Sequence, residues 1–104
     1  MRLFGKRAKV WDAYRNRKDG STVMAMKFDG GYGSTRDANK RMMIQGVYPR
    51  LVAGSDRKRA LKWVLPTGRP ITLFPGEWLV WSDALGFFFP VSDRIFSDTF
   101  EKLP

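Results

Sequence analysis

The spacing of apolar residues along the chain predicts a series of short strands. Six segments are rich in β-branched, aromatic or other apolar residues: 22–28, 48–53, 59–65, 71–73, 78–82 and 87–91. The turn Pro66-Thr67-Gly68 makes a hairpin of the third and fourth segments, and Pro75-Gly76 forms another turn. Pro90 lacks a backbone N–H, which restricts the last strand to an edge of the sheet or places Pro90 at the end of the strand.

Two further segments have the start and stop signals of short helices. The first begins at Ser34 or Thr35, either of which can cap it, and ends before Gly46. Ser92 can cap the second helix, whose expected apolar face consists of Ile95, Phe96, Phe100 and Leu103. Because strands and helices do not alternate as βαβ units, the pattern predicts an α+β fold with a small, mainly antiparallel sheet and two short helices.

The first 20 residues differ from the rest, since they carry many basic and few large apolar side chains. Val10, Trp11 and Tyr14 have helical spacing, so this segment is either a short basic helix or a flexible arm, followed by a turn at Asp19-Gly20. We therefore expect a basic N-terminal arm or helix, residues 1–20, and a single compact α+β domain, residues 21–104. A chain of 104 residues is long enough to bury one core.

The absence of two residue types narrows the chemistry. The chain has no cysteine and no histidine, which excludes disulfides, thiolate metal sites, a cysteine nucleophile and the usual general base at neutral pH. The carboxylates do not cluster on any one element: Asp29, Asp37, Asp56, Glu77, Asp83, Asp93, Asp98 and Glu101. We expect no enzymatic activity, no metal site and no cofactor.

The sequence predicts neither a membrane-spanning segment nor a signal peptide. No stretch approaches the roughly 20 apolar residues that span a bilayer, and the basic start of the chain is not followed by the apolar run of a signal peptide. We expect a soluble protein of the cytoplasm that has no membrane partner.

The distribution of charge gives the strongest functional signal. Residues 1–69 hold 17 of the 19 basic residues and 5 of the 10 acidic ones, a net charge of +12, whereas residues 70–104 carry −3. Lysine and arginine contact phosphates without reading sequence, and aromatic side chains stack on unpaired bases. The residues that we expect to bind nucleic acid are Lys6, Arg7, Lys9, Trp11, Tyr14, Arg15, Arg17, Lys18, Arg36, Lys40, Arg57, Lys58, Arg59 and Lys62.

Other partners are compatible with the same charges. An acidic host protein would also fit a basic face, and a solvated surface with no partner is the plainest interpretation. The segment 30–35, Gly-Gly-Tyr-Gly-Ser-Thr, precedes the first predicted helix, where backbone N–H groups can hold a phosphate. No lysine follows its last glycine, as a phosphate-binding loop requires, so a turn with a helix cap is the better interpretation.

The C-terminal third contains an ordered set of motifs. Residues 75–80 read Pro-Gly-Glu-Trp-Leu-Val, residues 86–91 read Gly-Phe-Phe-Phe-Pro-Val, and residues 93–101 read Asp-Arg-Ile-Phe-Ser-Asp-Thr-Phe-Glu. With the strand 23–30 that ends in Phe28-Asp29-Gly30, this order resembles small phage and prophage proteins of the PGDYG type. The resemblance covers about residues 18–102. The chain departs from the namesake motif, with Glu77-Trp78-Leu79 in place of Asp-Tyr-Gly.

The resemblance implies a phage origin and a compact α+β fold, and it implies no activity, because the family is largely uncharacterised. We therefore expect a phage-encoded accessory protein that binds nucleic acid, DNA or RNA, in the host cytoplasm with little sequence specificity. Two alternatives stay open: a protein that binds and modulates a host protein, and a component of the virion or of its assembly.

Overall fold

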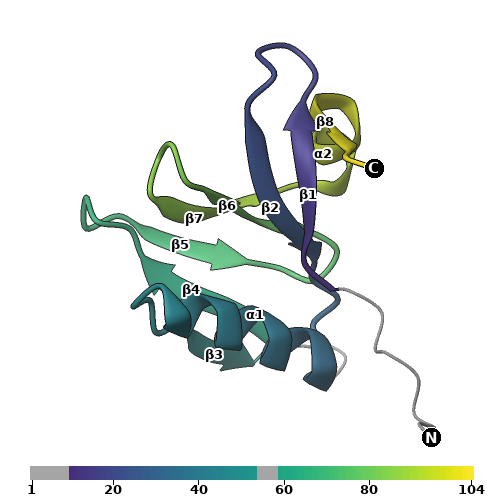
Figure 1. Cartoon of the computed structure of the whole chain (residues 1–104). Coiled ribbons are helices and arrows are strands. Elements are labelled where there is room, and N and C mark those ends of the chain that lie inside the picture. Colours follow the sequence, from purple (N-terminus) through teal and green to yellow (C-terminus); the bar gives the residue numbers. More distant parts are fainter. Residues whose placement is uncertain (1–9, 54–58) are drawn as a thin grey trace, which may run out of the picture.

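Two antiparallel sheets and two helices make up the structure, a computed structural model that describes residues 10–53 and 59–104 (Figure 1). The larger sheet has the order β7-β6-β2-β1-β8 and the smaller one the order β3-β4-β5. The strands are β1 (Asp12–Asn16), β2 (Thr22–Lys27), β3 (Arg50–Ala53), β4 (Arg59–Val64), β5 (Pro70–Leu73), β6 (Trp78–Ser82), β7 (Phe87–Val91) and β8 (Phe100–Lys102). The helices are α1 (Tyr32–Ile44) and α2 (Asp93–Thr99).

Two adjacent inner strands of the larger sheet, β2 and β6, are buried on both faces. Met26 and Leu79 point into a core shared with α1 and the smaller sheet, whose members are Met26, Phe28, Ala38, Met42, Leu61, Trp63, Leu73, Leu79 and Phe88. Their neighbours Ala25 and Val80 point the other way, into a second core beneath α2 that also contains Val23, Phe96 and Phe100. Since side chains alternate along a strand, the two cores share the same backbone.

The smaller sheet and α1 form a layer of their own on the first core. In Figure 1, α1 lies along β3 and β4, whereas the β1–β2 hairpin and α2 lie at the other end of the molecule. The turn at Pro75-Gly76 links the layers, because the N–H of Gly76 donates to the carbonyl of Phe28 at 2.7 Å. Gly76 has a φ of 95°, a left-handed conformation that favours glycine.

The α+β fold and its antiparallel pairing are confirmed, and several predicted elements are found where expected. β2 and β4 to β7 lie within the six predicted segments or within a residue of them, and Pro90 is on the edge strand β7. The Ser92 hydroxyl caps α2 by accepting the N–H of Ile95 at 3.3 Å. The strands are divided between two sheets, since β3, β4 and β5 form a second one.

The described part of the N-terminal segment is neither a helix nor an arm. Asp12–Asn16 form β1, which pairs with β2 on one side and with β8 on the other. Sheet pairing on both sides outweighs the helical spacing of Val10, Trp11 and Tyr14, because it satisfies the backbone of the whole strand. Residues 1–9 lie outside the described residues.

Two predicted details of the helices also need correction. α1 begins at Tyr32 with Gly31 as a cap that makes no side-chain hydrogen bond, and the Ser34 hydroxyl instead accepts the N–H of Asp29 at 3.0 Å. α2 ends at Thr99, and Phe100 starts the short strand β8. Ile95, expected on the apolar face of α2, is 59% exposed, so Phe96 is the residue that anchors this helix.

Replacement of Phe96 by alanine should lower the free energy of unfolding by about 3–5 kcal/mol, because it empties a buried aromatic site. The Phe96 ring is 2% exposed and stacks on Trp78 at a centroid distance of 4.0 Å. Urea denaturation measures the loss. The matched control is Ile95→Ala on the exposed side of the same helix, which should cost less than about 1 kcal/mol; similar losses in the two variants would contradict this account of α2.

Candidate nucleic-acid interface

The structure separates the predicted basic residues into groups that do not share one face. Lys6, Arg7, Lys9, Arg57 and Lys58 lie outside the described residues. Arg15, Arg17 and Lys18 lie on β1 and the turn after it. Arg36 and Lys40 lie on α1, and Arg59 and Lys62 on β4, at the other end of the molecule (Figure 1).

The arginines of β1 are engaged by an acidic side chain of β8. Nε of Arg15 donates to Oε2 of Glu101 at 3.0 Å, and Arg17 contacts Oε1 of the same carboxylate at 3.4 Å. The hydrogen bond and the charge of Arg15 hold the pKa of Glu101 below its usual range. Sequence reasoning missed this pairing, because Glu101 is 86 residues away from Arg15 along the chain. Part of the positive charge of this group is therefore neutralised within the protein.

The two aromatic residues expected to stack on bases are partly buried and pack against the two cores. Trp11 donates from Nε1 to the carbonyl of Asp37 at 3.3 Å and packs against the first core. The guanidinium of Arg41 lies over its ring, 5.3 Å from the centroid. Tyr14 meets Phe96 edge to face at 4.9 Å. Both rings therefore contribute to the packing of the fold.

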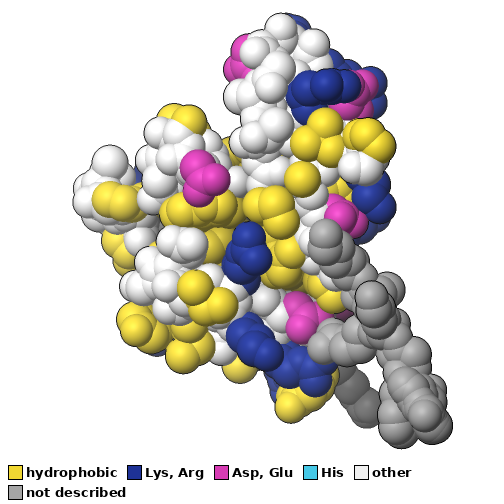
Figure 2. Space-filling view, in the orientation of Figure 1, with side chains coloured by type: hydrophobic (Ala, Val, Ile, Leu, Met, Phe, Trp, Pro, Cys, Tyr) yellow, Lys and Arg dark blue, Asp and Glu magenta, His cyan; other side chains and the backbone are white. Residues whose placement is uncertain are grey.

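One basic group of the described residues lies on α1 and the start of β4. α1, β3 and β4 together carry six basic residues and a single acidic one, Asp37. Figure 2 shows lysine and arginine side chains gathered over α1. We call Arg36, Lys40, Arg41 and Arg59 the α1–β4 basic group.

The other two basic residues of this layer, Arg50 and Lys62, lie on the face of the smaller sheet that points away from α1. Arg59 and Leu61 are two positions apart on β4 and share the side that faces α1. Lys62 points to the opposite side of the smaller sheet, together with its cross-strand partner Arg50. The sequence grouped Arg59 and Lys62 together. In the structure they lie on opposite faces of the smaller sheet, because side chains alternate along β4.

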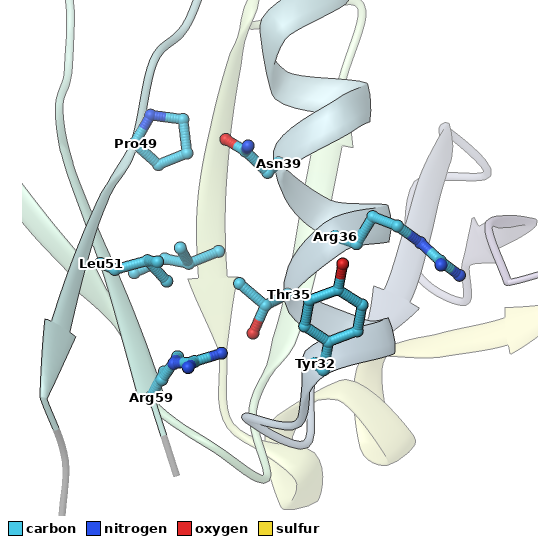
Figure 3. Close-up of a pocket in the computed structure, with 8 residues that line it drawn as sticks. Tyr32, Thr35, Arg36, Asn39, Pro49, Leu51 and Arg59 are labelled. Carbon is cyan, nitrogen blue, oxygen red and sulfur yellow. The ribbon is translucent and has the colours of Figure 1, made fainter.

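A pocket opens between α1 and the smaller sheet, with a volume of about 360 Å³ (Figure 3). Its lining residues are Tyr32, Thr35, Arg36, Asn39, Pro49, Leu51, Arg59 and Leu61. Pro49, Leu51 and Leu61 supply the apolar part of the lining. Arg59 extends its guanidinium from β4 toward Thr35 (Figure 3). The pocket therefore joins an apolar wall to one member of the α1–β4 basic group.

Thr35 is the least satisfied polar residue of this pocket. It is 8% exposed, and its Oγ1 atom is buried without a hydrogen-bond partner among the described residues. A buried hydroxyl without a partner costs folding free energy, so a group that pairs with it is favoured to bind. The indole Nε1 of Trp63 is likewise buried and unpaired, and it lies beside separate hollows of about 230 and 370 Å³ at Gly46 and Val47.

Most acidic side chains hold parts of the fold together. Asp93 accepts the indole N–H of Trp78 at 2.8 Å and pairs with Lys27, and both partners lower its pKa. Asp12 pairs with Lys102 at 3.2 Å, and Glu77 accepts the N–H of Phe74 at 2.7 Å. Within residues 10–53 and 59–104, no three acidic side chains form a group that could hold a metal ion.

In that part of the chain, neither helix has the length and apolar character required to cross a membrane. Comparison of the chain with protein-family models, with curated proteins and with solved structures finds no match in any of the three. The resemblance to PGDYG-type phage proteins therefore stays a prediction from the sequence.

Replacement of Thr35 by valine should raise the free energy of unfolding by about 1 kcal/mol, since a methyl group takes the place of an unpaired buried hydroxyl. Thr35→Ser is the matched control, because it keeps the hydroxyl and loses the methyl group, and it should lower stability by about 1 kcal/mol. Urea denaturation of both variants tests this, and a less stable valine variant would show that the hydroxyl is paired in the folded protein.

Replacement of Arg15 by alanine should raise the pKa of Glu101 toward its usual range. Because the folded-state pKa is depressed, the stabilisation by Glu101 is present above its unfolded pKa and is lost as the pH falls through the folded value. An NMR titration of the carboxyl groups measures the shift. Lys27→Ala serves as the control, since it should raise the pKa of Asp93 and leave that of Glu101 unchanged.

Proposed function

We propose that this protein is a phage-encoded accessory protein that binds nucleic acid through the α1–β4 basic group and catalyses no reaction. The observation that carries the proposal is the exposure of Arg36, Lys40 and Arg59 in a layer with Asp37 as its single acidic side chain among the described residues of α1, β3 and β4. Arg36 and Lys40 are one helical turn apart, so both reach the same phosphate backbone.

Electrostatics supports the choice of a polyanion as partner. The net charge of +9 favours association with nucleic acid at low salt. Contacts of this kind release counterions, so the affinity falls steeply as salt rises, and they carry little sequence information. The phage origin and the host cytoplasm as the place of action are supported by the resemblance of residues 18–102 alone.

The proposal of a binding role over catalysis is supported by what the acidic residues do. Histidine and cysteine are missing from the sequence. The carboxylates of Glu101, Asp93 and Asp12 contact basic partners on neighbouring elements, so these groups contribute to the fold. General acid–base chemistry needs a carboxylate whose pKa is raised toward neutrality, whereas the shifts of Asp93 and Glu101 are in the opposite direction.

A second candidate function, binding to a host protein, is favoured by exposed apolar residues next to the same layer. Ile44 and Tyr48 are 73% and 70% exposed, and Val64 lies exposed on β4. Strand β3 is an edge strand with all four residues exposed, which leaves one side of its backbone available for pairing. A pull-down from nuclease-treated host lysate separates the two functions: a stoichiometric protein that is lost with Tyr48→Ser would favour this one.

Binding of the full chain to fluorescein-labelled DNA and RNA should weaken strongly between low and physiological salt. Lys40→Glu should lower the affinity several-fold and reduce the slope of log affinity against log salt by about 1, because about one phosphate contact is lost. The matched control is Arg94→Glu on α2, which changes the net charge equally on an exposed residue outside the basic group. Absence of binding at low salt, or equal losses in the two variants, would contradict the proposal.

A further inference from the structure

The pocket between α1 and the smaller sheet has two chemically different ends (Figure 3). At one end, Asn39 of α1 lies opposite Pro49 and Leu51 (Figure 3). At the other end, Arg59 extends from β4 toward the first turn of α1. Thr35 lies between the two ends, so a ligand that fills the pocket meets an apolar wall, a hydroxyl and a guanidinium in turn.

The buried hydroxyl of Thr35 indicates that the pocket takes a ligand with polar groups. Thr35 is buried, with 8% of its surface exposed, and its Oγ1 atom has no hydrogen-bond partner among the described residues. A hydroxyl both donates and accepts, and the Asn39 amide beside it also does both. Together they can pair with the mixed donors and acceptors at one edge of a nucleobase, and Pro49 and Leu51 offer an apolar surface across the pocket.

The positive charge at the other end comes from a side chain. The N-terminus of α1 is partly satisfied, because the carboxylate of Asp29 accepts the N–H of Gly31 at 2.7 Å. The anion site therefore depends on Arg59. A backbone hydrogen bond of 3.1 Å from Arg59 to the carbonyl of Gly30 fixes the start of β4 beside the start of α1. The guanidinium of Arg36 points away from Thr35 at the rim (Figure 3) and pairs with Asp37 at 3.7 Å, and from there it can contact a neighbouring phosphate.

We propose that this pocket takes one unpaired nucleotide of a single-stranded nucleic acid, with its base between Thr35, Asn39 and Leu51 and its phosphate at Arg59. The inference rests on the proposed function and sharpens it. A volume of about 360 Å³ falls in the range of small-molecule pockets. A base that is paired and stacked in a duplex cannot enter such a pocket without being flipped out, which costs unstacking energy. The protein therefore prefers single strands.

The test compares a labelled single strand of about 12 nucleotides with a duplex of the same sequence, by fluorescence anisotropy with the full chain at low salt. The wild type should bind the single strand more tightly. Thr35→Val should weaken single-strand binding about three- to tenfold, as expected for one lost hydrogen bond, and leave duplex binding unchanged. Leu51→Trp, at a residue that is 57% exposed, should obstruct the pocket and have the same selective effect.

Lys40→Ala is the matched control, since it removes a phosphate contact outside the pocket and should weaken both complexes equally. Thermal melting confirms that each variant is folded. Equal binding of both nucleic acids by the wild type, or unchanged single-strand binding by Thr35→Val and Leu51→Trp, overturns the pocket and leaves the proposed function standing. Absence of all binding at low salt overturns both.

A mononucleotide competitor distinguishes a strand from a free nucleotide as the occupant. Free nucleotide lacks the neighbouring phosphates that Arg36 and Lys40 contact, so it should displace the labelled strand only at millimolar concentration. Displacement at the concentration at which the unlabelled strand itself competes would overturn the strand as the ligand of this pocket.

Discussion

The antiparallel pair of β2 and β6 must be covered on both faces, and the rest of the fold supplies the two covers. Met26 and Leu79 need α1 and the smaller sheet on one side, and Ala25 and Val80 need α2 on the other. Strands buried on both faces are unusual in a small antiparallel sheet, where one face is commonly solvated. This constraint explains why a chain of 104 residues is divided into layers, and why the layer that carries the basic group is separated from the end where α2 packs.

The same constraint shows what the sequence could and could not predict. Strands such as β6 and the hairpin of β4 and β5 were predictable, because their alternation and their turns are local. The smaller sheet was not recognised as separate, because nothing in the alternation of Leu61 and Trp63 indicates that their strand does not join β2. β1 was missed for a related reason: partners distant in sequence, β8 above all, decide its conformation.

The sequence predicted that the candidate site is basic, but it predicted only part of where the site lies. Arg36, Lys40 and Arg59 were identified from composition and spacing, and the structure brings them to neighbouring elements. The pairing of Arg15 and Arg17 with Glu101 could not be foreseen, since it depends on the register of β1 against β8. The pocket at Thr35 gave no signal as a side-chain site, because the sequence presents Thr35 as a helix cap and says nothing of Leu51 and Pro49 opposite it.

Trp11 holds the beginning of the described chain against α1. Its indole N–H bonds to the carbonyl of Asp37, and its ring lies against the guanidinium of Arg41, so residue 11 is held at the flank of α1. Lys6, Arg7 and Lys9 precede Trp11 by five residues or fewer in the sequence. If α1 binds a polyanion as proposed, the covalent length of the chain confines these three charges to within about 20 Å of residue 11, beside the same partner.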